Sequence, residues 1–135
     1  MGSPVQPRSY IETDLDEVLA LCGAEGWTTY SDDPVRAHGV FSAPGVVSVV
    51  ATSSGAVIGF AYFQTDGAIQ AHLSLLVVSL AHRREGVARE LFDCAATRLG
   101  AIRVDLITDT AETFYRSLPH KEQVGFRIYP GTKQH

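Results

Sequence analysis

The first apolar pattern along the chain has the period of an α-helix. Four apolar residues recur at the spacing i, i+3, i+4, i+7, which places them on one helical face: Leu15, Val18, Leu19 and Cys22. Asp14 stands just before this run and Glu17 follows it by three residues, the arrangement of a capping box. A second helix is predicted to begin at Asp33-Pro34, because proline is favoured at the first helical position, and to end before Ala43.

The middle of the chain has the composition of β-strands. Compact β-branched runs cover residues 46–51, 57–63 and 69–78, and the segments between them, Ser53–Gly55 and Asp66-Gly67, are turn sequences. Strands joined by turns this short pair antiparallel. The pattern therefore predicts a meander of three consecutive strands.

The last part of the chain alternates between the two periods. A helix is predicted over residues 87–99 with Gly100 ending it, then a strand over 103–108, a short helix over 111–117 and a last strand over 125–129. A strand–helix–strand step requires a parallel crossover. The predicted fold class is therefore α/β (α+β), a mixed, mainly antiparallel sheet of six or so strands flanked by about four helices.

Composition narrows the class of protein. With 135 residues and a mass of 14.6 kDa, residues 1–135 are predicted to form a single domain. Hydrophobic residues make up 45% of the chain, enough to bury a core. Eleven Lys+Arg against fifteen Asp+Glu leave a formal charge of −4. This balance argues against a general nucleic-acid binder, since such proteins neutralise phosphates with clustered basic residues.

Other patterns bear on compartment and cofactors. Cys22 and Cys94 cannot make a disulfide framework and are predicted to be reduced, buried thiols of a cytoplasmic protein. No Cys or His pair has the spacing of metal ligands, so no metal is predicted. The N-terminal sequence lacks the apolar stretch of a signal peptide, and the longest near-apolar run, residues 73–82, is too short to span a bilayer. We therefore predict no membrane partner.

The most informative chemistry lies where the third strand of the meander ends. A basic loop follows residues 76–78 and a helix opens at Gly86, with Arg83, Arg84 and Arg89 close together in an otherwise acidic chain. A helix N-terminus leaves amides unpaired and carries partial positive charge, and a glycine lets an anion approach them closely. The residues suit a pyrophosphate. An ordinary strand–turn–helix with a solvated basic loop is equally compatible with them, and neither a Walker loop nor a dinucleotide fingerprint is present.

In the order of its elements and motifs, the chain resembles the GNAT superfamily of acyl-CoA-dependent N-acyltransferases. The basic loop reads Arg-x-x-Gly-x-Ala from Arg83 to Ala88, and an amphipathic helix, a strand, the segment Ala111–Tyr115 and later Gly125-Phe126 follow it. The likeness spans residues 14–129 and is strongest over residues 73–115.

The resemblance implies acetyl-CoA (coenzyme A) as cosubstrate and assigns residues to it. The pyrophosphate is expected at the loop and the helix start, on Arg83, Arg84, Gly86, Val87, Ala88 and Arg89. The pantetheine arm is expected along the end of the preceding strand, on Leu76, Val77 and Val78. Tyr115 matches the tyrosine that commonly protonates the departing thiolate, and a phenol with a pKa near 10 is protonated at neutral pH. The alternative for Tyr115 is a core aromatic packed beside Phe114.

The general base is predicted on the strand before the basic loop. His72 and Ser74 alternate along this strand, which predicts that both side chains point to the same face as Leu76. Arylalkylamine acetyltransferases resemble this chain in carrying histidine there. A neutral imidazole can take a proton from an ammonium, directly or through water. A hydrogen-bonded structural histidine is the alternative reading of His72.

Two departures from the family pattern concern ligand contacts. Thr108 stands three residues before Ala111, where the family often has an asparagine that holds the pantetheine, and its hydroxyl is predicted to replace part of that bonding. Residues 117–124 form an insertion between Tyr115 and Gly125. His120 within it is a candidate acceptor contact, and a surface loop without a role is the alternative.

The acceptor pocket is predicted at the first two helices and the loop between them. Trp27 and Tyr30 place two aromatic rings in that loop, where they either line a pocket or cap the core. The acidic pair Asp32-Asp33 suits a cationic amine and equally suits helix capping. These residues do not identify the acceptor.

The main hypothesis is direct transfer of an acetyl group from acetyl-CoA to a primary amine of a small molecule, with Tyr115 as general acid. Direct transfer requires that the site orient both reactants, stabilise the oxyanion and supply a proton to sulfur. The alternatives are a protein or peptide N-acetyltransferase and a non-catalytic acyl-CoA-binding sensor. The missing strand carboxylate and Thr108 favour the sensor, whereas Tyr115 argues against it. A homodimer, frequent in this superfamily, is compatible with the chain.

Overall fold

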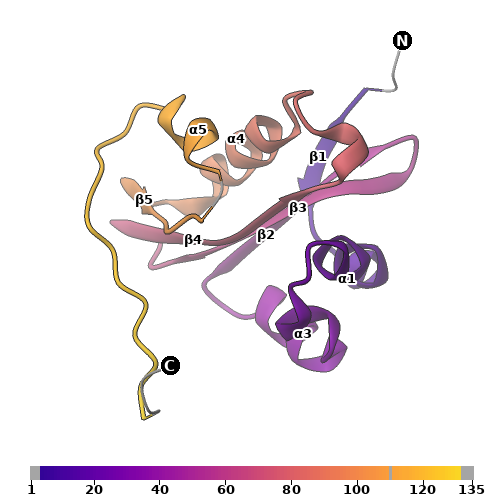
Figure 1. The fold of residues 1–135 in the computed structure, drawn as a ribbon, viewed down its shortest axis with the longest axis horizontal. Helices are drawn as coiled ribbons and strands as arrows, with labels where there is room; N and C mark the ends of the chain where they lie inside the picture. The colour runs from indigo at the N-terminus through magenta and orange to yellow at the C-terminus, as the bar shows by residue number, and fades with distance from the viewer. Residues whose placement is uncertain (1–3, 110, 132–135) are drawn as a thin grey trace. The chain divides into compact units, whose positions relative to one another are not determined.

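The computed structural model describes residues 4–109 and 111–131, and the chain divides after Asp105 into two compact units. The first unit holds a sheet of strands β1 (Gln6–Ser9), β2 (Val46–Ser53), β3 (Ala56–Thr65), β4 (Gln70–Val78) and β5 (Arg103–Asp105). Its helices are α1 (Leu15–Ala24), α2 (Thr28–Ser31), α3 (Pro34–Phe41) and α4 (Val87–Leu99). The second unit holds α5 (Glu112–Arg116). Figure 1 shows these elements in chain order.

The five strands lie side by side in the order of the chain, with β1 at one edge and β5 at the other. Neighbouring strands from β1 to β4 pair antiparallel, and β4 pairs with β5 parallel. The predicted meander is therefore confirmed as β2–β3–β4, and the predicted crossover as β4–α4–β5. The fold class is confirmed as well, with a sheet of five strands.

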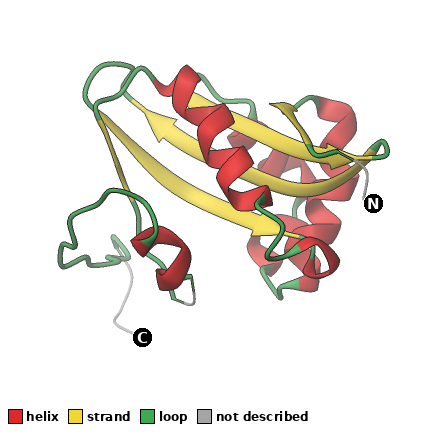
Figure 2. Ribbon diagram, turned by 90° about the horizontal axis from the view of Figure 1, so that it is seen from above, coloured by secondary structure: helices red, strands yellow, loops and turns green. Residues whose placement is uncertain are grey.

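Helices cover both faces of this sheet. Figures 1 and 2 show α4 lying along one face and α1 and α3 on the other. On the α1–α3 face, the Phe41 ring packs against Phe60 and Tyr62, with centroids 4.7 and 5.2 Å away. On the α4 face, Phe63 packs edge-on against Phe92 at 5.7 Å. Successive residues of β3 thus enter two different cores, as the alternation of a strand requires.

A β-bulge interrupts the pairing of β3 with β4. Tyr62 pairs with Leu75, and the next residue on β3, Phe63, pairs with Leu73. Ser74 is therefore an extra residue on β4 with no counterpart on β3. One extra residue reverses the alternation of side chains along the rest of a strand.

The bulge determines which face each half of β4 presents. Before it, His72 pairs with Gln64 and shares the α1–α3 face of the sheet. After it, Leu76 pairs with Ala61, which alternates onto the α4 face. The prediction that His72 and Ser74 point to the same face as Leu76 is therefore wrong, because the alternation that it assumed is broken between them.

The two N-terminal helices begin with different chemistry. At α3, the Asp33 carboxylate accepts from the Arg36 amide at 3.1 Å, which confirms the predicted start. At α1, Asp14 makes no side-chain cap. Its buried carboxylate accepts from both terminal guanidinium nitrogens of Arg8, at 2.8 Å each, and from the Ile11 amide at 2.9 Å. The predicted capping box is wrong, because an arginine of β1 holds the carboxylate instead.

The second unit contains less regular structure than predicted. The strand expected over residues 103–108 ends at Asp105, the helix expected over residues 111–117 is α5, and residues 125–129 form no strand. Val124, Phe126 and Ile128 alternate as strand residues do, but their exposed fractions are 83, 78 and 79%. A strand forms only where its backbone groups find a partner, and an alternating sequence does not supply one.

Candidate active site

The predicted strand–loop–helix junction forms as β4, a 3-10 turn (Leu80–His82), the basic loop and α4. The bounds of α4 are those predicted, and Gly86 precedes it with a φ of 82°, a conformation that favours glycine. A Cβ at Gly86 would meet no atom within 4 Å, so the space beside it is open. The Glu90 amide donates to the Gly86 carbonyl at 3.1 Å. The helix amides ahead of it are those that an α-helix leaves unpaired: Val87, Ala88 and Arg89.

Gly59 in β3 lets α4 lie close to the sheet. A Cβ at this position would lie 3.0 Å from Val87 Cγ1, 3.1 Å from Leu91 Cδ1 and 3.3 Å from the Val77 carbonyl oxygen. Val87 and Leu91 are themselves buried, at 2 and 0% exposure. The start of α4 is therefore fixed against β3 and β4 by contacts that a larger residue would break.

The arginines of the junction have different partners. Arg83 forms an ion pair with Glu25, the residue after α1, and its Nε donates to the Val78 carbonyl at 3.2 Å. Arg89 pairs with a carboxylate one turn later on α4. Arg84 is exposed, with a positive φ of 65°, and no ion pair engages its guanidinium anywhere in residues 4–109 and 111–131. Arg84 is thus the arginine most available to an anionic ligand.

The junction fits a phosphate-bearing ligand. The Nδ1 atom of His82 is buried and has no hydrogen-bond partner among the described residues. It precedes the basic loop directly, and two kinds of donor that lack an acceptor among the described residues follow it: the first amides of α4 and the Arg84 guanidinium. Phosphate oxygens accept hydrogen bonds from such groups. The residues therefore suit the pyrophosphate of coenzyme A.

The second half of β4 is open along one edge. β5 pairs only with Gln70–His72, so among the described residues β3 is the one strand that pairs with residues 73–78. Val77 points into the core at 3% exposure, whereas Leu76 and Val78 are half-buried. Backbone groups along an open edge can pair with an extended ligand. This edge includes the three residues assigned to pantetheine by the resemblance.

A strip of polar side chains crosses the α1–α3 face of the sheet, and we call its five members the polar strip: Tyr30, Tyr62, Ser74, Gln64 and His72. The Tyr30 and Tyr62 hydroxyls are 2.8 Å apart, and Ser74 hydrogen-bonds the Tyr62 hydroxyl. Gln64 Nε2 donates to Ser74 Oγ at 3.2 Å, and His72 is the cross-strand neighbour of Gln64. Burial raises the pKa of Tyr62, so this phenol stays protonated.

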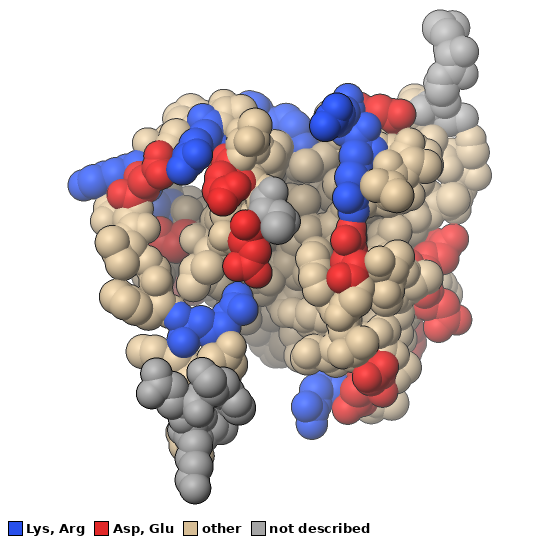
Figure 3. Space-filling view, viewed as in Figure 1, with Lys and Arg blue, Asp and Glu red and all other residues tan. Residues whose placement is uncertain are grey.

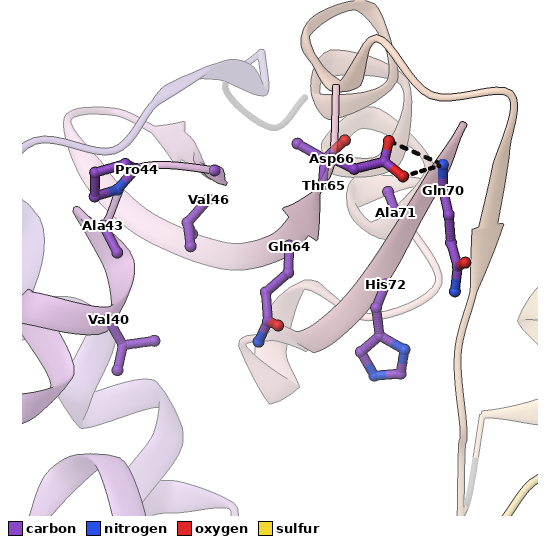
Figure 4. A pocket seen from close by; sticks show the side chains of 11 residues that line it. Val40, Ala43, Pro44, Val46, Gln64, Thr65, Asp66, Gln70, Ala71 and His72 are labelled. Carbon is purple, nitrogen blue, oxygen red and sulfur yellow. Dashed lines mark hydrogen bonds between the residues drawn. The ribbon is translucent and has the colours of Figure 1, made fainter. Parts of the chain in front are cut away.

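The strip ends in a groove of about 570 Å³ between the end of α3 and the strands β3 and β4. Figure 4 shows Gln64 and His72 projecting into it from the sheet, opposite Val40 of α3 and beside Val46 of β2. The predicted base, His72, therefore faces a groove that is open to solvent.

One carboxylate lines the groove, and it is already engaged. Asp66 Oδ1 accepts from the amides of Ala68 and Ile69 at 2.8 Å, and both of its oxygens accept from the Gln70 amide (Figure 4). These hydrogen bonds hold the pKa of Asp66 below its usual value, so it is ionised at neutral pH. Its role is to close the turn between β3 and β4.

Three predicted site residues lie in the second unit: Tyr115, Thr108 and His120. Tyr115 of α5 is half-buried beside Phe114, with ring centroids 5.0 Å apart. Burial raises the pKa of the Tyr115 phenol, which keeps it protonated at neutral pH. Thr108 Oγ1 accepts from the Ala111 amide at 3.1 Å and so holds the turn that leads into α5.

The predicted acceptor contacts lie in different surroundings. Trp27 directly precedes α2 and is 39% exposed. Tyr30 stacks on Phe41 with centroids 5.9 Å apart and belongs to the core, so its ring caps the core while its hydroxyl begins the polar strip. His120 is exposed in the second unit, where its Nε2 lies 3.5 Å from Glu122.

Three residues of the site went unnoticed in the sequence. Gln64 is polar at the end of an apolar strand, and Gly59 interrupts that same strand, which is a known sign of close backbone approach. Both features can be recognised in the sequence alone. Glu25 carries no such signal, because its pairing with Arg83 joins segments far apart in the chain.

Charged side chains and potential metal ligands are dispersed over the described part of the chain. On the face drawn in Figure 3, basic and acidic side chains are interspersed and do not merge into a broad basic surface. Among the residues that the structure describes, no group of three His, Cys, Asp or Glu side chains is placed to hold a metal ion. No helix in the described ranges has both the length and the apolarity needed to cross a bilayer. Cys22 is buried as predicted, but Cys94 is only half-buried.

Comparisons with known proteins identify one family by a family model and a shared fold by solved structures. A family model described as an acetyltransferase (GNAT) domain matches residues 16–128. Similar solved structures include a transcriptional regulator from Bacillus halodurans C-125 (19% identity, TM-score 0.79, 93% of this chain and 99% of that one). The aminoglycoside N-acetyltransferase AAC(6')-Iy, bound to a bisubstrate analogue, has 20% identity and a TM-score of 0.78 over 97% of this chain and 100% of its own. A GNAT-family acetyltransferase from Streptococcus pneumoniae TIGR4 has 23% identity and a TM-score of 0.73 over 96 and 98%. No curated protein matches the sequence.

Proposed function

The chain belongs to the GNAT acetyltransferase family, and from that premise we propose that it is an acetyl-CoA-dependent N-acetyltransferase acting on a primary amine of a small molecule. The observation that carries the proposal is the set of donors at the β4–α4 junction that lack an acceptor among the described residues, formed by the first amides of α4 and the Arg84 guanidinium. In this proposal the two units, residues 1–105 and 106–135, work together as one acetyltransferase domain.

The junction would bind the cosubstrate in two parts. The pyrophosphate would accept hydrogen bonds from the loop and the first amides of α4, with Gly86 leaving room for its approach. The pantetheine arm would pair with the open backbone edge of Leu76–Val78. Acetyl-CoA supplies the acetyl group as a thioester, which the amine attacks directly.

His72 is the proposed general base and Tyr115 the proposed general acid. His72 would take a proton from the substrate ammonium, which frees the lone pair that forms the new N–C bond. As the C–S bond breaks, the Tyr115 phenol would donate its proton to the leaving thiolate. On going from ammonium to amide the nitrogen loses two protons: the first passes through His72 to solvent, and the second, released as the N–C bond forms, compensates the proton that Tyr115 gives to sulfur, so the transfer involves no change of oxidation state. The raised pKa of Tyr115 keeps the acid protonated before each turnover.

Thermal unfolding with and without acetyl-CoA tests the proposal. At about a hundred times its dissociation constant, a ligand stabilises the folded state by roughly 2.7 kcal/mol, which raises the Tm of a domain of this size by several degrees. Arg84→Glu should lose most of that rise, and Arg36→Glu, which changes an exposed arginine of α3, should keep it. No rise at millimolar acetyl-CoA would overturn the proposal.

Turnover over a panel of primary amines then separates the enzyme from a sensor. Tyr115→Phe should lower kcat by about 10²-fold or more, because it removes a general acid. Binding of acetyl-CoA without turnover of any amine would favour an acyl-CoA sensor instead. Full turnover by Tyr115→Phe at its pH optimum would remove the acid role from this tyrosine.

A further inference from the structure

We propose that the groove binds the acceptor, and that this acceptor is a primary monoamine on an apolar body, not a polycation. The inference rests on the proposed function and narrows it to a substrate class. It is carried by the unequal walls of the groove, by the scarcity of free carboxylates in it and by the orientation of Gln64 (Figure 4).

The two walls of the groove differ in polarity. Val40, Pro44 and Val46 form an apolar wall at the end of α3 and the start of β2. Gln64 and His72 form a polar wall on the sheet (Figure 4). A ligand that satisfies both walls has an apolar body and one polar end. The polar end must be the amine, because it has to meet the base.

The charges of the lining argue against a second ammonium. Among the described residues that line the groove, Asp66 is the single carboxylate, and it closes the turn between β3 and β4. A second cationic group would therefore have one counter-charge at most, and would otherwise lie against the apolar wall. Removing a charge from water without a partner is costly. None of the described residues that line the groove is Lys or Arg, so one ammonium meets no repulsion from them.

Gln64 is oriented to receive the amine. Its Nε2 donates to Ser74 Oγ at 3.2 Å, which turns its carbonyl oxygen away from Ser74. A carbonyl oxygen accepts an N–H of an ammonium or amine, and His72 is the cross-strand neighbour that would take the proton. Gln64 is therefore a positioning residue: it would direct the nitrogen toward His72 without taking a proton itself.

The first experiment compares n-hexylamine with spermidine and neamine as acceptors and as ligands. We expect kcat/KM for n-hexylamine to exceed that of either polycation by about tenfold or more, the discrimination that apolar contacts provide. In an NMR titration of the same protein, n-hexylamine should shift the signals of Val40, Val46 and the Gln64 side chain. Better turnover of spermidine or neamine, or shifts confined to other residues, would overturn the inference.

Variants of the apolar wall test the same point. Val46→Asp should lower the ratio of kcat/KM for n-hexylamine to that for spermidine about tenfold or more. The new carboxylate removes an apolar contact with the hexyl chain and provides a counter-charge for a second ammonium of spermidine. Val40→Asp should lower the ratio as well. The same change at two positions would not be explained by a folding defect at one of them. Val35→Asp is the matched control, since Val35 is 85% exposed on α3 and does not line the groove. An unchanged ratio in both folded variants would contradict the proposal.

Gln64→Leu separates positioning from folding. It should raise KM for n-hexylamine about tenfold while the Tm rise with acetyl-CoA stays as in the wild type. This design distinguishes failure of the proposed substrate class from failure of the proposed function. If acetyl-CoA stabilises the protein and polycations are preferred, only the substrate class is wrong. If acetyl-CoA does not bind, the proposed function falls, and the NMR titration still decides whether the groove prefers an apolar monoamine.

Discussion

The two halves of β4 differ in what lies beside them. Over Gln70–His72, the strand has β3 on one side and β5 on the other, and its two exposed residues, Gln70 and His72, line the groove. Over Leu75–Val78, β3 is the one strand of the described residues that pairs with β4, so the other edge is open, and α4 begins close to Gly59. Ser74 separates the halves. In the proposed function, one strand thus offers the His72 side chain to the acceptor and its backbone edge to the cosubstrate: the extra residue sets the face of His72, and the short pairing with β5 leaves the edge open.

The strongest way to break this division is to delete Ser74. Without the extra residue, His72 would move to the opposite face of the sheet. We expect kcat/KM to fall by more than about a hundredfold, the usual contribution of a general base, while acetyl-CoA still raises the Tm. The matched control is Ser74→Ala, which keeps the bulge and loses only the hydroxyl. Equal activity of the deletion variant and the wild type would show that the bulge does not place the base.

Gly59→Ala tests the half of β4 that faces α4. The new Cβ would lie 3.0 Å from Val87 and 3.1 Å from Leu91, both buried. We expect the free energy of unfolding to fall by about 1–3 kcal/mol, as overpacking does, and acetyl-CoA to bind more weakly because the start of α4 moves. In α3, Gly39 has open space around it, so Gly39→Ala should stabilise the helix. Urea unfolding measures the free energy of unfolding of both variants, and equal values would rule out close packing at Gly59.

Acid should affect the α1 side through Asp14. The Arg8 guanidinium, followed by the Ile11 amide, holds the pKa of the buried Asp14 carboxyl below its unfolded value. A lowered folded pKa contributes stability that is present above the unfolded pKa, near 3.8, and is lost as the pH falls through the folded pKa. Between pH 6 and pH 2.5, the wild type should therefore lose about 1 kcal/mol more stability than Asp14→Asn, a modest value because Arg8 is screened by solvent. Equal losses in urea titrations of the two proteins would contradict this.

The smallest expected effect concerns Glu25. Its carboxylate pairs with Arg83, which competes with any phosphate for that guanidinium. Glu25→Gln should lower the Kd for acetyl-CoA about twofold to fivefold at low salt, as expected for a partly exposed ion pair, and the gain should shrink at high salt. Asp16→Asn makes the same change of charge elsewhere on α1 and should leave the Kd unchanged. Calorimetric titration measures both, and weaker binding by Glu25→Gln would show that the pair supports the loop.

The predictable elements were those whose sequence patterns are local and strong. The helix over residues 87–99 was predicted to the residue, because its apolar face, Gly86 and Gly100 are all encoded within it. The meander followed from two short turns in the same way. The helix start at Asp33 was predictable for the same reason, because the Arg36 amide that its carboxylate accepts from lies in the first turn of the same helix.

The features that escaped prediction depend on distant segments. The bulge at Ser74 exists only in relation to β3, and Asp14 is held by Arg8 from a strand whose existence the sequence barely indicates. The groove joins α3, β2, β3 and β4, so Gln64 and Val46 could not be grouped beforehand. Over residues 125–129, the alternation was read correctly, yet no partner strand in the described part of the chain meets it.

The far end of α4 is tied to the turn that borders the groove. Thr65 Oγ1 donates to the Leu99 carbonyl at 2.7 Å, and Gly100 lies so close to Gly67 that a Cβ would be 2.8 Å from its carbonyl oxygen. One helix therefore has the proposed pyrophosphate loop at its first turn and the edge of the acceptor groove at its last. If that connection transmits any effect, thermodynamics makes it reciprocal: the factor by which acetyl-CoA changes the affinity for the amine equals the factor by which the amine changes the affinity for acetyl-CoA.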